Sequence, residues 1–199
     1  MKTIYWKAIL ITASLSLFIG CGKQVSRVRA DSVIDISGKW NDTDSRLVAD
    51  EMIADCMSKG WLYKYQSAKT TPTVIVGKIR NKSHEHISVE TFVKDIEKAL
   101  INSGRIEFVA SKEERKQLRE EVADQTSNSS AETAKSAGEE QGADLMLIGT
   151  INQIVDQEGS KAVNFYQIDM QLIELETNKK VWIGDKKIKK YVTRNKTKF

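Results

Sequence analysis

Residues 163–175 read Val-Asn-Phe-Tyr-Gln-Ile-Asp-Met-Gln-Leu-Ile-Glu-Leu, the most regular alternation of apolar and polar side chains in the chain. A period of two predicts a β-strand with one buried and one solvated face. The predicted inner face comprises Tyr166, Ile168, Met170 and Leu172, and the predicted outer face comprises Gln167, Asp169 and Gln171.

Two further strands are predicted beside this one, over residues 144–156 and 179–192. Short turns at residues 157–160 and 176–178 separate the three strands, which predicts an antiparallel meander. We therefore expect this meander to form the C-terminal part of a single domain.

The first part of the domain alternates strands with helices. A helix is predicted from Ser45 to Lys59, a strand from Thr73 to Ile79, a helix from Ser88 to Ser103, and a strand from Ile106 to Ala110. A charged helix follows over residues 112–123, then a polar loop over residues 125–130 and another helix that ends near Gly142. This order predicts crossovers that pack helices against the same sheet. The expected fold is α/β, with a mixed sheet of about five strands and flanking helices.

Two details of this expectation concern strands. Residues 73–79 form a continuous, β-branched apolar run after Pro72, the only proline, and we expect this strand to be buried on both faces. Residues 32–36 are expected to form a short strand in an extended lead-in.

The N-terminus is typical of an export signal. Lys2 and Lys7 flank a positive start, Ala8–Ile19 is almost entirely apolar, and Gly20 directly precedes Cys21. The apolar run is too short to span a bilayer as a helix, which takes ~20 residues. Residues 1–20 are therefore predicted to be a lipoprotein signal peptide, and Cys21 the site of lipid attachment. The alternative is a buried cysteine at the end of a hydrophobic first helix.

Cleavage before Cys21 would leave 179 residues and lower the net charge from +4 to +2, because residues 1–20 contain two lysines and no acid. This near-neutral balance gives no case for nucleic-acid binding. We expect residues 21–31 to be a tether and residues 32–199 to be one α/β domain. A lipidated Cys21 would leave Cys56 as the one free thiol, and its place on the apolar face of the helix from Ser45 predicts a small core residue.

The residues give little support for catalysis. His84 and His86 flank Glu85, but a catalytic zinc needs three protein ligands and the chain has no third histidine. Asp42 and Asp44 resemble the start of a calcium loop, yet Leu47 occupies the position that requires glycine, so helix capping is the better interpretation. We expect no enzyme activity, no catalytic residues, no metal and no cofactor.

The C-terminal region is strongly basic. From Lys186 onward it contains no acid, and its basic residues are Lys186, Lys187, Lys189, Lys190, Arg194, Lys196 and Lys198. These side chains could attract an acidic partner surface or anionic lipids, or they could protect an edge strand against aggregation. The sequence favours neither interpretation.

Residues 31–48 read Asp-Ser-Val-Ile-Asp-Ile-Ser-Gly-Lys-Trp-Asn-Asp-Thr-Asp-Ser-Arg-Leu-Val, and this stretch resembles the opening of the penicillin-binding protein activator LpoB family. The resemblance continues more loosely through residues 74–103 and the Glu114-Arg115 helix, and resumes at Gly142-Ala143-Asp144-Leu145-Met146-Leu147-Ile148-Gly149. It implies an α/β domain like the N-terminal domain of TolB.

The same resemblance implies a non-enzymatic, lipid-anchored protein on the periplasmic side of the outer membrane. Its implied partner is a class A penicillin-binding protein, a bifunctional peptidoglycan synthase that it would bind and stimulate. Familiar members carry a long tether rich in proline and glutamine, whereas the tether here is short and lacks proline.

The Gly142–Gly149 segment also resembles the CsgG family of outer-membrane secretion lipoproteins, which is the alternative. A channel requires several strands with continuous lipid-facing apolar rows, and residues 163–175 alone show clear alternation. The oligomeric state is left open.

Overall fold

The computed structural model describes residues 24–130 and 140–194, and the chain divides into two compact units at Ser32. In the first unit, described residues 24–32 are mostly exposed and contain only a turn at residues 30 and 31. The Arg29 guanidinium pairs with the Asp31 carboxylate at 2.7 Å. Cys21 and the predicted signal peptide lie outside the described residues.

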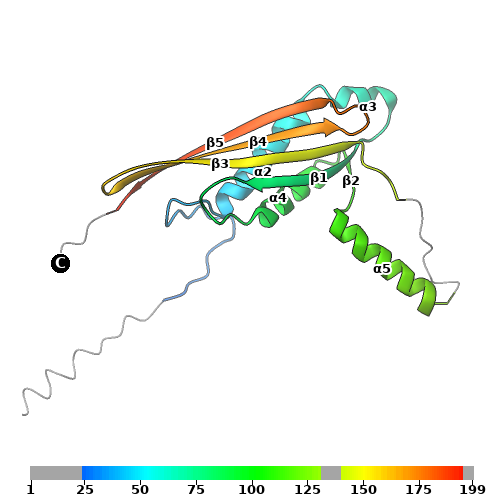
Figure 1. Cartoon of the computed structure of the whole chain (residues 1–199), viewed down its shortest axis with the longest axis horizontal. Coiled ribbons are helices and arrows are strands. Elements are labelled where there is room, and N and C mark those ends of the chain that lie inside the picture. The colour runs from blue at the N-terminus through cyan, green and yellow to red at the C-terminus, as the bar shows by residue number, and fades with distance from the viewer. Residues whose placement is uncertain (1–23, 131–139, 195–199) are drawn as a thin grey trace, which may run out of the picture. The chain divides into compact units, whose positions relative to one another are not determined.

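The second unit begins at Val33 and contains a mixed sheet with the order β2-β1-β3-β4-β5 (Figure 1). Strand β1 is parallel to β2 and β3, whereas β3, β4 and β5 are antiparallel. The predicted mixed five-stranded α/β fold is therefore confirmed. The elements are α2 (Asp42–Ser58), α3 (Leu62–Ala68), β1 (Thr73–Asn81), α4 (Val89–Asn102), β2 (Glu107–Phe108), α5 (Lys112–Asn128), β3 (Leu145–Glu158), β4 (Lys161–Glu174) and β5 (Lys180–Thr193).

Two helices begin with reciprocal capping boxes. At α2, the Asn41 side chain accepts from Asp44 N (3.1 Å) and the Asp44 carboxylate accepts from Asn41 N (2.9 Å). Ser111 and Glu114 make the same pair of bonds at α5. Each box satisfies two backbone N–H groups that have no partner within the helix. Asp44 thus caps a helix, as predicted, although α2 starts at Asp42 rather than Ser45.

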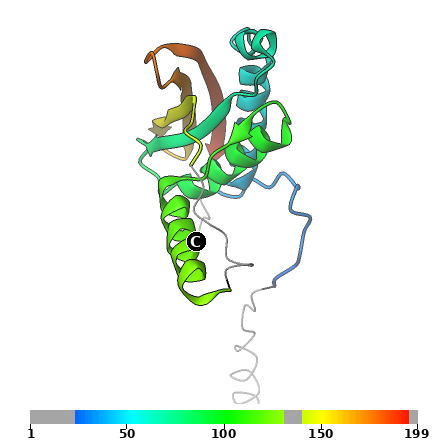
Figure 2. The same ribbon diagram turned by 90° about the vertical axis from the view of Figure 1, so that its right-hand side faces the viewer.

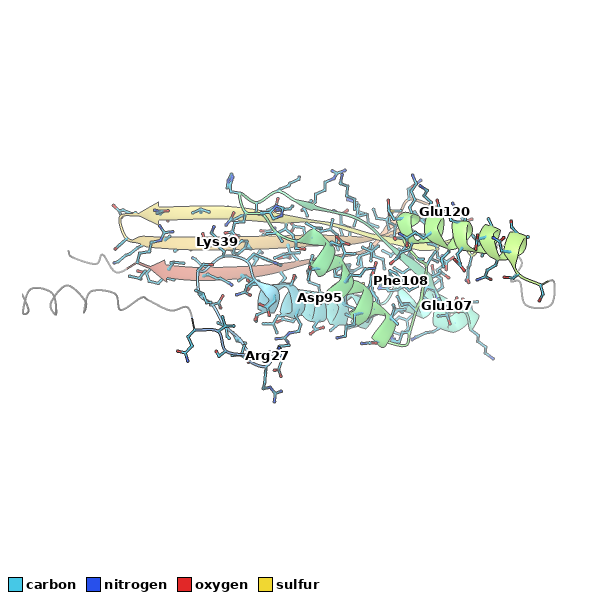
Figure 3. The ribbon with its side chains drawn as sticks, turned by 90° about the horizontal axis from the view of Figure 1, so that it is seen from below. Arg27, Lys39, Asp95, Glu107, Phe108 and Glu120 are labelled. Atoms are coloured by element: carbon cyan, nitrogen blue, oxygen red, sulfur yellow. The ribbon has the colours of Figure 1, made fainter. Side chains whose placement is uncertain are left out.

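The core lies between one face of the sheet and helices α2 and α4, which run side by side across that face (Figure 3). Val48 of α2 and Phe92 and Ile96 of α4 are fully buried there. The predicted inner face of β4 is confirmed, because Tyr166, Ile168, Met170 and Leu172 are each at most 1% exposed. Cys56 is buried in the same core, as predicted.

Helix α5 projects away from the sheet and from helices α2 and α4 (Figure 2). It starts just after β2, and none of its described side chains is buried. It continues to Asn128, so the predicted loop at residues 125–130 is wrong for most of its length. Hydrogen bonds one turn apart, such as Gln125 to Glu121 and Asn128 to Asp124, extend the helix through this polar stretch.

Other expectations also need correction. Residues 33–36 form no strand; they are exposed, and Asp35 instead holds this segment through Lys190 and Asn41. Strand β1 is not buried on both faces, because α2 and α4 cover only one of them: Val74 is fully buried, whereas Ile75 is partly exposed. Strand β2 has only two residues.

The region before β3 was predicted to contain another helix. Residues 140–142 are not helical, and residues 131–139 lie outside the described part. Helix α3 was not predicted at all. Within the described residues, no helix is both long and apolar enough to span a membrane.

Candidate interaction surface

The side chains of β3, β4 and β5 that point away from α2 and α4 form a second surface, here called the open sheet face. All of them are partly or fully exposed. The open sheet face comprises Met146, Ile148, Thr150, Asn152, Ile154, Asp156, Glu158, Lys161, Val163, Phe165, Gln167, Asp169, Gln171, Ile173, Ile183, Asp185, Lys187, Lys189, Tyr191 and Thr193.

The register of the meander orders these side chains into rows across the three strands. Ile154 lies opposite Phe165, which lies opposite Lys189. One row along, Asn152, Gln167 and Lys187 stand beside one another in the same way. Side chains in directly opposite positions are close enough to interact, so each row presents a continuous strip to solvent.

The centre of the open sheet face is a polar network around Asp169. Asn152 Nδ2 donates to Asp169 Oδ2 at 3.0 Å and to Thr150 Oγ1 at 3.2 Å. Gln167 Nε2 donates to Asp169 Oδ1 at 2.8 Å. Both carboxylate oxygens therefore have partners, and these side chains are held in defined positions.

Apolar side chains flank this polar centre at both ends. Ile154 and Tyr191 are 65% and 63% exposed at one end, and Ile183 is 64% exposed at the other. Charges of both signs lie beside the first group: Lys189 is opposite Phe165, Asp156 is opposite Val163, and Lys187 pairs with Asp185 at 3.0 Å. Exposed apolar side chains that lie together on a surface mark candidate sites of protein docking.

A partly buried cluster fixes the chain segments at the β3–β4 end of the sheet. The Glu85 carboxylate accepts hydrogen bonds from Tyr166 Oη (2.7 Å), Gln153 Nε2 (2.7 Å) and Trp40 N (3.0 Å). Burial of Tyr166, followed by its bond to Glu85, raises the pKa of that phenol. The Glu85 side chain, on the loop after β1, thus connects the segment before α2 to strands β3 and β4.

A second cluster ties the end of β5 to the start of α2. The Lys190 ammonium lies 2.6 Å from both the Asp35 and the Asp44 carboxylates and donates to the Lys39 carbonyl at 3.1 Å. The hydrogen bond from Lys190 holds the pKa of the Asp35 carboxyl below its usual value. Lys186 likewise pairs with Glu51 of α2. These lysines of the basic C-terminal region are therefore structural.

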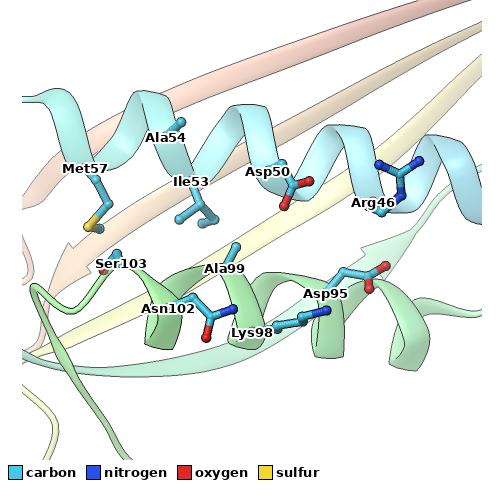
Figure 4. A pocket seen from close by; sticks show the side chains of 10 residues that line it. All are labelled: Arg46, Asp50, Ile53, Ala54, Met57, Asp95, Lys98, Ala99, Asn102 and Ser103. Carbon is cyan, nitrogen blue, oxygen red and sulfur yellow. The ribbon is translucent and has the colours of Figure 1, made fainter. Parts of the chain in front are cut away.

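The helix side of the domain carries a groove of about 380 Å³ between α2 and α4 (Figure 4). Arg46 and Lys98 alternate there with Asp50 and Asp95, and burial followed by the charge of Asp50 raises the pKa of Asp95. Ser103 in this groove donates its hydroxyl hydrogen to the Leu100 carbonyl and so caps α4 rather than facing a base. The groove is the line of contact between helices α2 and α4.

Comparison with known protein families identifies the family of this chain. The profile described as peptidoglycan-synthase activator LpoB matches residues 44–188, which is most of the chain. The chain belongs to the LpoB family. The match covers all described elements except the first residues of α2 and the end of β5, so the open sheet face up to Lys187 lies within it.

Solved LpoB structures are similar to the chain at low identity. The LpoB C-terminal domain from Escherichia coli is 15% identical with a TM-score of 0.43, covering 76% of this chain and 99% of that one. The corresponding domain from Salmonella enterica is 15% identical with a TM-score of 0.40, covering 72% and 97%. No curated protein matches the chain.

Within this member of the LpoB family, the histidines and the thiol that the sequence analysis set aside as ligands or nucleophiles lie apart from the open sheet face. His84 and His86 are exposed on the loop after β1. Among the described residues, no group of three or more histidine, cysteine or acidic side chains could hold a metal ion. Burial raises the pKa of the Cys56 thiol to about 12, which keeps it protonated and unreactive.

The open sheet face itself was missed by the sequence prediction. The alternation of β4 had placed Gln167, Asp169 and Gln171 on an outer face, and this is confirmed. What the alternation could not show is which side chains of β3 and β5 stand beside them, because that depends on the register across two turns.

Proposed function

We propose that this chain is a lipid-anchored activator that binds a class A penicillin-binding protein through the open sheet face. The observation that carries this proposal is the family match over residues 44–188. The sequence adds an export signal that ends at Cys21, which would place the domain on the periplasmic side of the outer membrane. The open sheet face adds ordered polar groups between exposed apolar ones.

Activation would follow from a difference in affinity. A regulator shifts an enzyme toward its active conformation only if it binds that conformation more tightly than the inactive one. The domain would therefore dock on a surface of the synthase that changes between its two states. Ile154 and Tyr191 favour an apolar patch on the partner, whereas the charges of the open sheet face are of both signs, with Lys187 paired to Asp185.

Binding tests the docking surface. The full chain and a class A synthase of the same organism are purified in detergent, and their affinity is measured with the wild type and with Ile154→Glu. A charged side chain in a desolvated contact should weaken binding about tenfold or more. Tyr63→Glu is the matched control, because Tyr63 is 70% exposed on α3, away from the open sheet face. Equal affinity for both variants would overturn this assignment.

Fractionation tests the anchor separately. Cys21→Ser should remove the protein from the outer-membrane fraction and leave its signal peptide uncleaved, because it removes the sulfur that would carry the acyl chains. Cys56→Ala, which removes the other thiol, should leave the protein in the outer membrane. A processed protein that stays in the outer membrane after Cys21→Ser would contradict the lipid anchor without affecting the binding result.

A further inference from the structure

The junction of α4, β2 and α5 forms a groove of about 650 Å³ on a different part of the molecule from the open sheet face. Its apolar wall includes Phe108, which Figure 3 labels at this junction, together with Ile101 and Leu118. Ile101 and Leu118 are 54% and 57% exposed. Large apolar side chains left in a concave surface favour the docking of another segment.

The rim of this groove is acidic. Glu97, Glu114 and Glu121 line it. The Lys94 ammonium bonds to both Glu97 (2.7 Å) and Glu114 (2.8 Å), so one cation serves two carboxylates. Glu121 accepts a hydrogen bond from the neutral Gln125 side chain at 2.9 Å. The rim therefore keeps an excess of negative charge in a chain whose net charge is +4.

The complementary sequence is present in the chain itself. Residues 194–199 read Arg-Asn-Lys-Thr-Lys-Phe, with three cations, one large aromatic side chain and no acid. A segment of this kind could place its aromatic ring against Phe108 and Leu118 and its ammonium groups beside Glu114 and Glu121.

This segment is too short to reach the groove of its own molecule. Strand β5 ends at Thr193, opposite Lys161, whereas α5 follows β2, which pairs with the start of β1 at the other end of the sheet. The intervening 14-residue strands are roughly 45 Å long. Residues 195–199 span at most about 18 Å when fully extended. The donor must therefore be another molecule.

We propose that the groove between α4 and α5 binds residues 194–199 of a second copy of this chain. The contact joins two different surfaces, so it is heterologous and can continue from copy to copy unless the arrangement closes into a ring. Anchored copies in one membrane would be concentrated enough to favour it.

Sedimentation of the full chain in detergent tests this proposal. The wild type should show a mass that rises with protein concentration and falls with added salt, because the rim is charged. Leu118→Glu, and separately a chain ending at Arg194, should lose this rise, while Tyr63→Glu should keep it. A mass that does not depend on concentration in the wild type, or a rise that survives both changes, would overturn the proposal.

A charge exchange makes the test specific. Glu121→Lys should damage only the groove and Lys198→Glu only the tail, so each variant alone should associate less than the wild type. Mixing the two should restore association between the lysine of one groove and the glutamate of the other tail. Glu121 is chosen because it takes no part in the α5 capping box. A mixture no better than its components would contradict this contact.

Discussion

Single residues explain why distant parts of the chain meet at the β3–β4 end. Glu85 is the acceptor for Tyr166, Gln153 and Trp40, which belong to three separate segments. Nothing in the sequence around Glu85 predicts this role, because its three partners lie 45, 68 and 81 residues away along the chain. Long-range hydrogen bonds of this kind depend on the fold and leave no local pattern.

Tyr166→Phe should test this cluster. The variant keeps the ring in the core but removes a bond to a charged acceptor, so the free energy of unfolding should fall by about 1.5–3 kcal/mol. Urea unfolding measures the change. Tyr191→Phe, at a tyrosine 63% exposed on β5, should change stability by less than about 0.5 kcal/mol. A similar loss in both variants would argue against the role of Glu85.

Packing requires a glycine at position 149, at the end of the Gly142–Gly149 segment that resembles the family. A Cβ at this position would lie 2.7 Å from the Asp169 carbonyl oxygen on β4, a contact that side chains cannot make without moving the strand. Gly149→Ala should therefore destabilise the domain by about 1–3 kcal/mol. Gly142→Ala, where a Cβ meets no atom within 4 Å, should be nearly neutral. Thermal unfolding of both variants distinguishes these expectations.

Among the elements, the long helices and strands with strong periodicity were the predictable ones. Helices α2 and α4 and strands β3–β5 agree with the sequence within a few residues. Helix α3 was missed because it is only seven residues long and Leu62 is its single buried side chain, too little for a helical period. Residues 32–36 were predicted to form a short strand, but a strand needs a partner strand, and the polar contacts of Ile34 and Asp35 go to Asn41 and Lys190 instead.

Helix α5 depends on its first turn more than on packing. Bonds from Lys94 and then from Ser111 hold the pKa of Glu114 at about 2, below its usual value near 4.5. A lowered carboxyl pKa stabilises the fold above pH 4.5, and this contribution is lost as the pH falls toward 2.

Glu114→Gln should therefore weaken α5 at pH 6 by about 0.5–1 kcal/mol, since it removes the charge but keeps an oxygen acceptor. The difference from the wild type should shrink between pH 4.5 and pH 2, where the wild-type carboxylate also loses its charge. Urea unfolding followed by far-UV circular dichroism at pH 6 and pH 3 provides the comparison. Glu113→Gln, outside the capping box, is the matched control. A pH-independent difference would contradict the assignment.

For the molecule as a whole, the sequence predicted the fold class and the family but not the open sheet face, the surface proposed to bind the partner. Alternation in one strand identifies an outer face, yet the open sheet face needs three strands in register and helices confined to the other side. The strand at residues 73–79 shows the same limit, because an apolar run does not tell how many faces are covered. The proposed function of the whole molecule rests on the family match over residues 44–188 together with the open sheet face.

The central claim is that this chain stimulates a peptidoglycan synthase by binding it. The most direct measurement is the rate of glycan polymerisation by a purified class A synthase of the same organism, with increasing amounts of the full chain. The account predicts a rate that rises to a plateau with wild type and with Tyr63→Glu, and that rises less with Ile154→Glu. An unchanged rate at concentrations that saturate binding would contradict it.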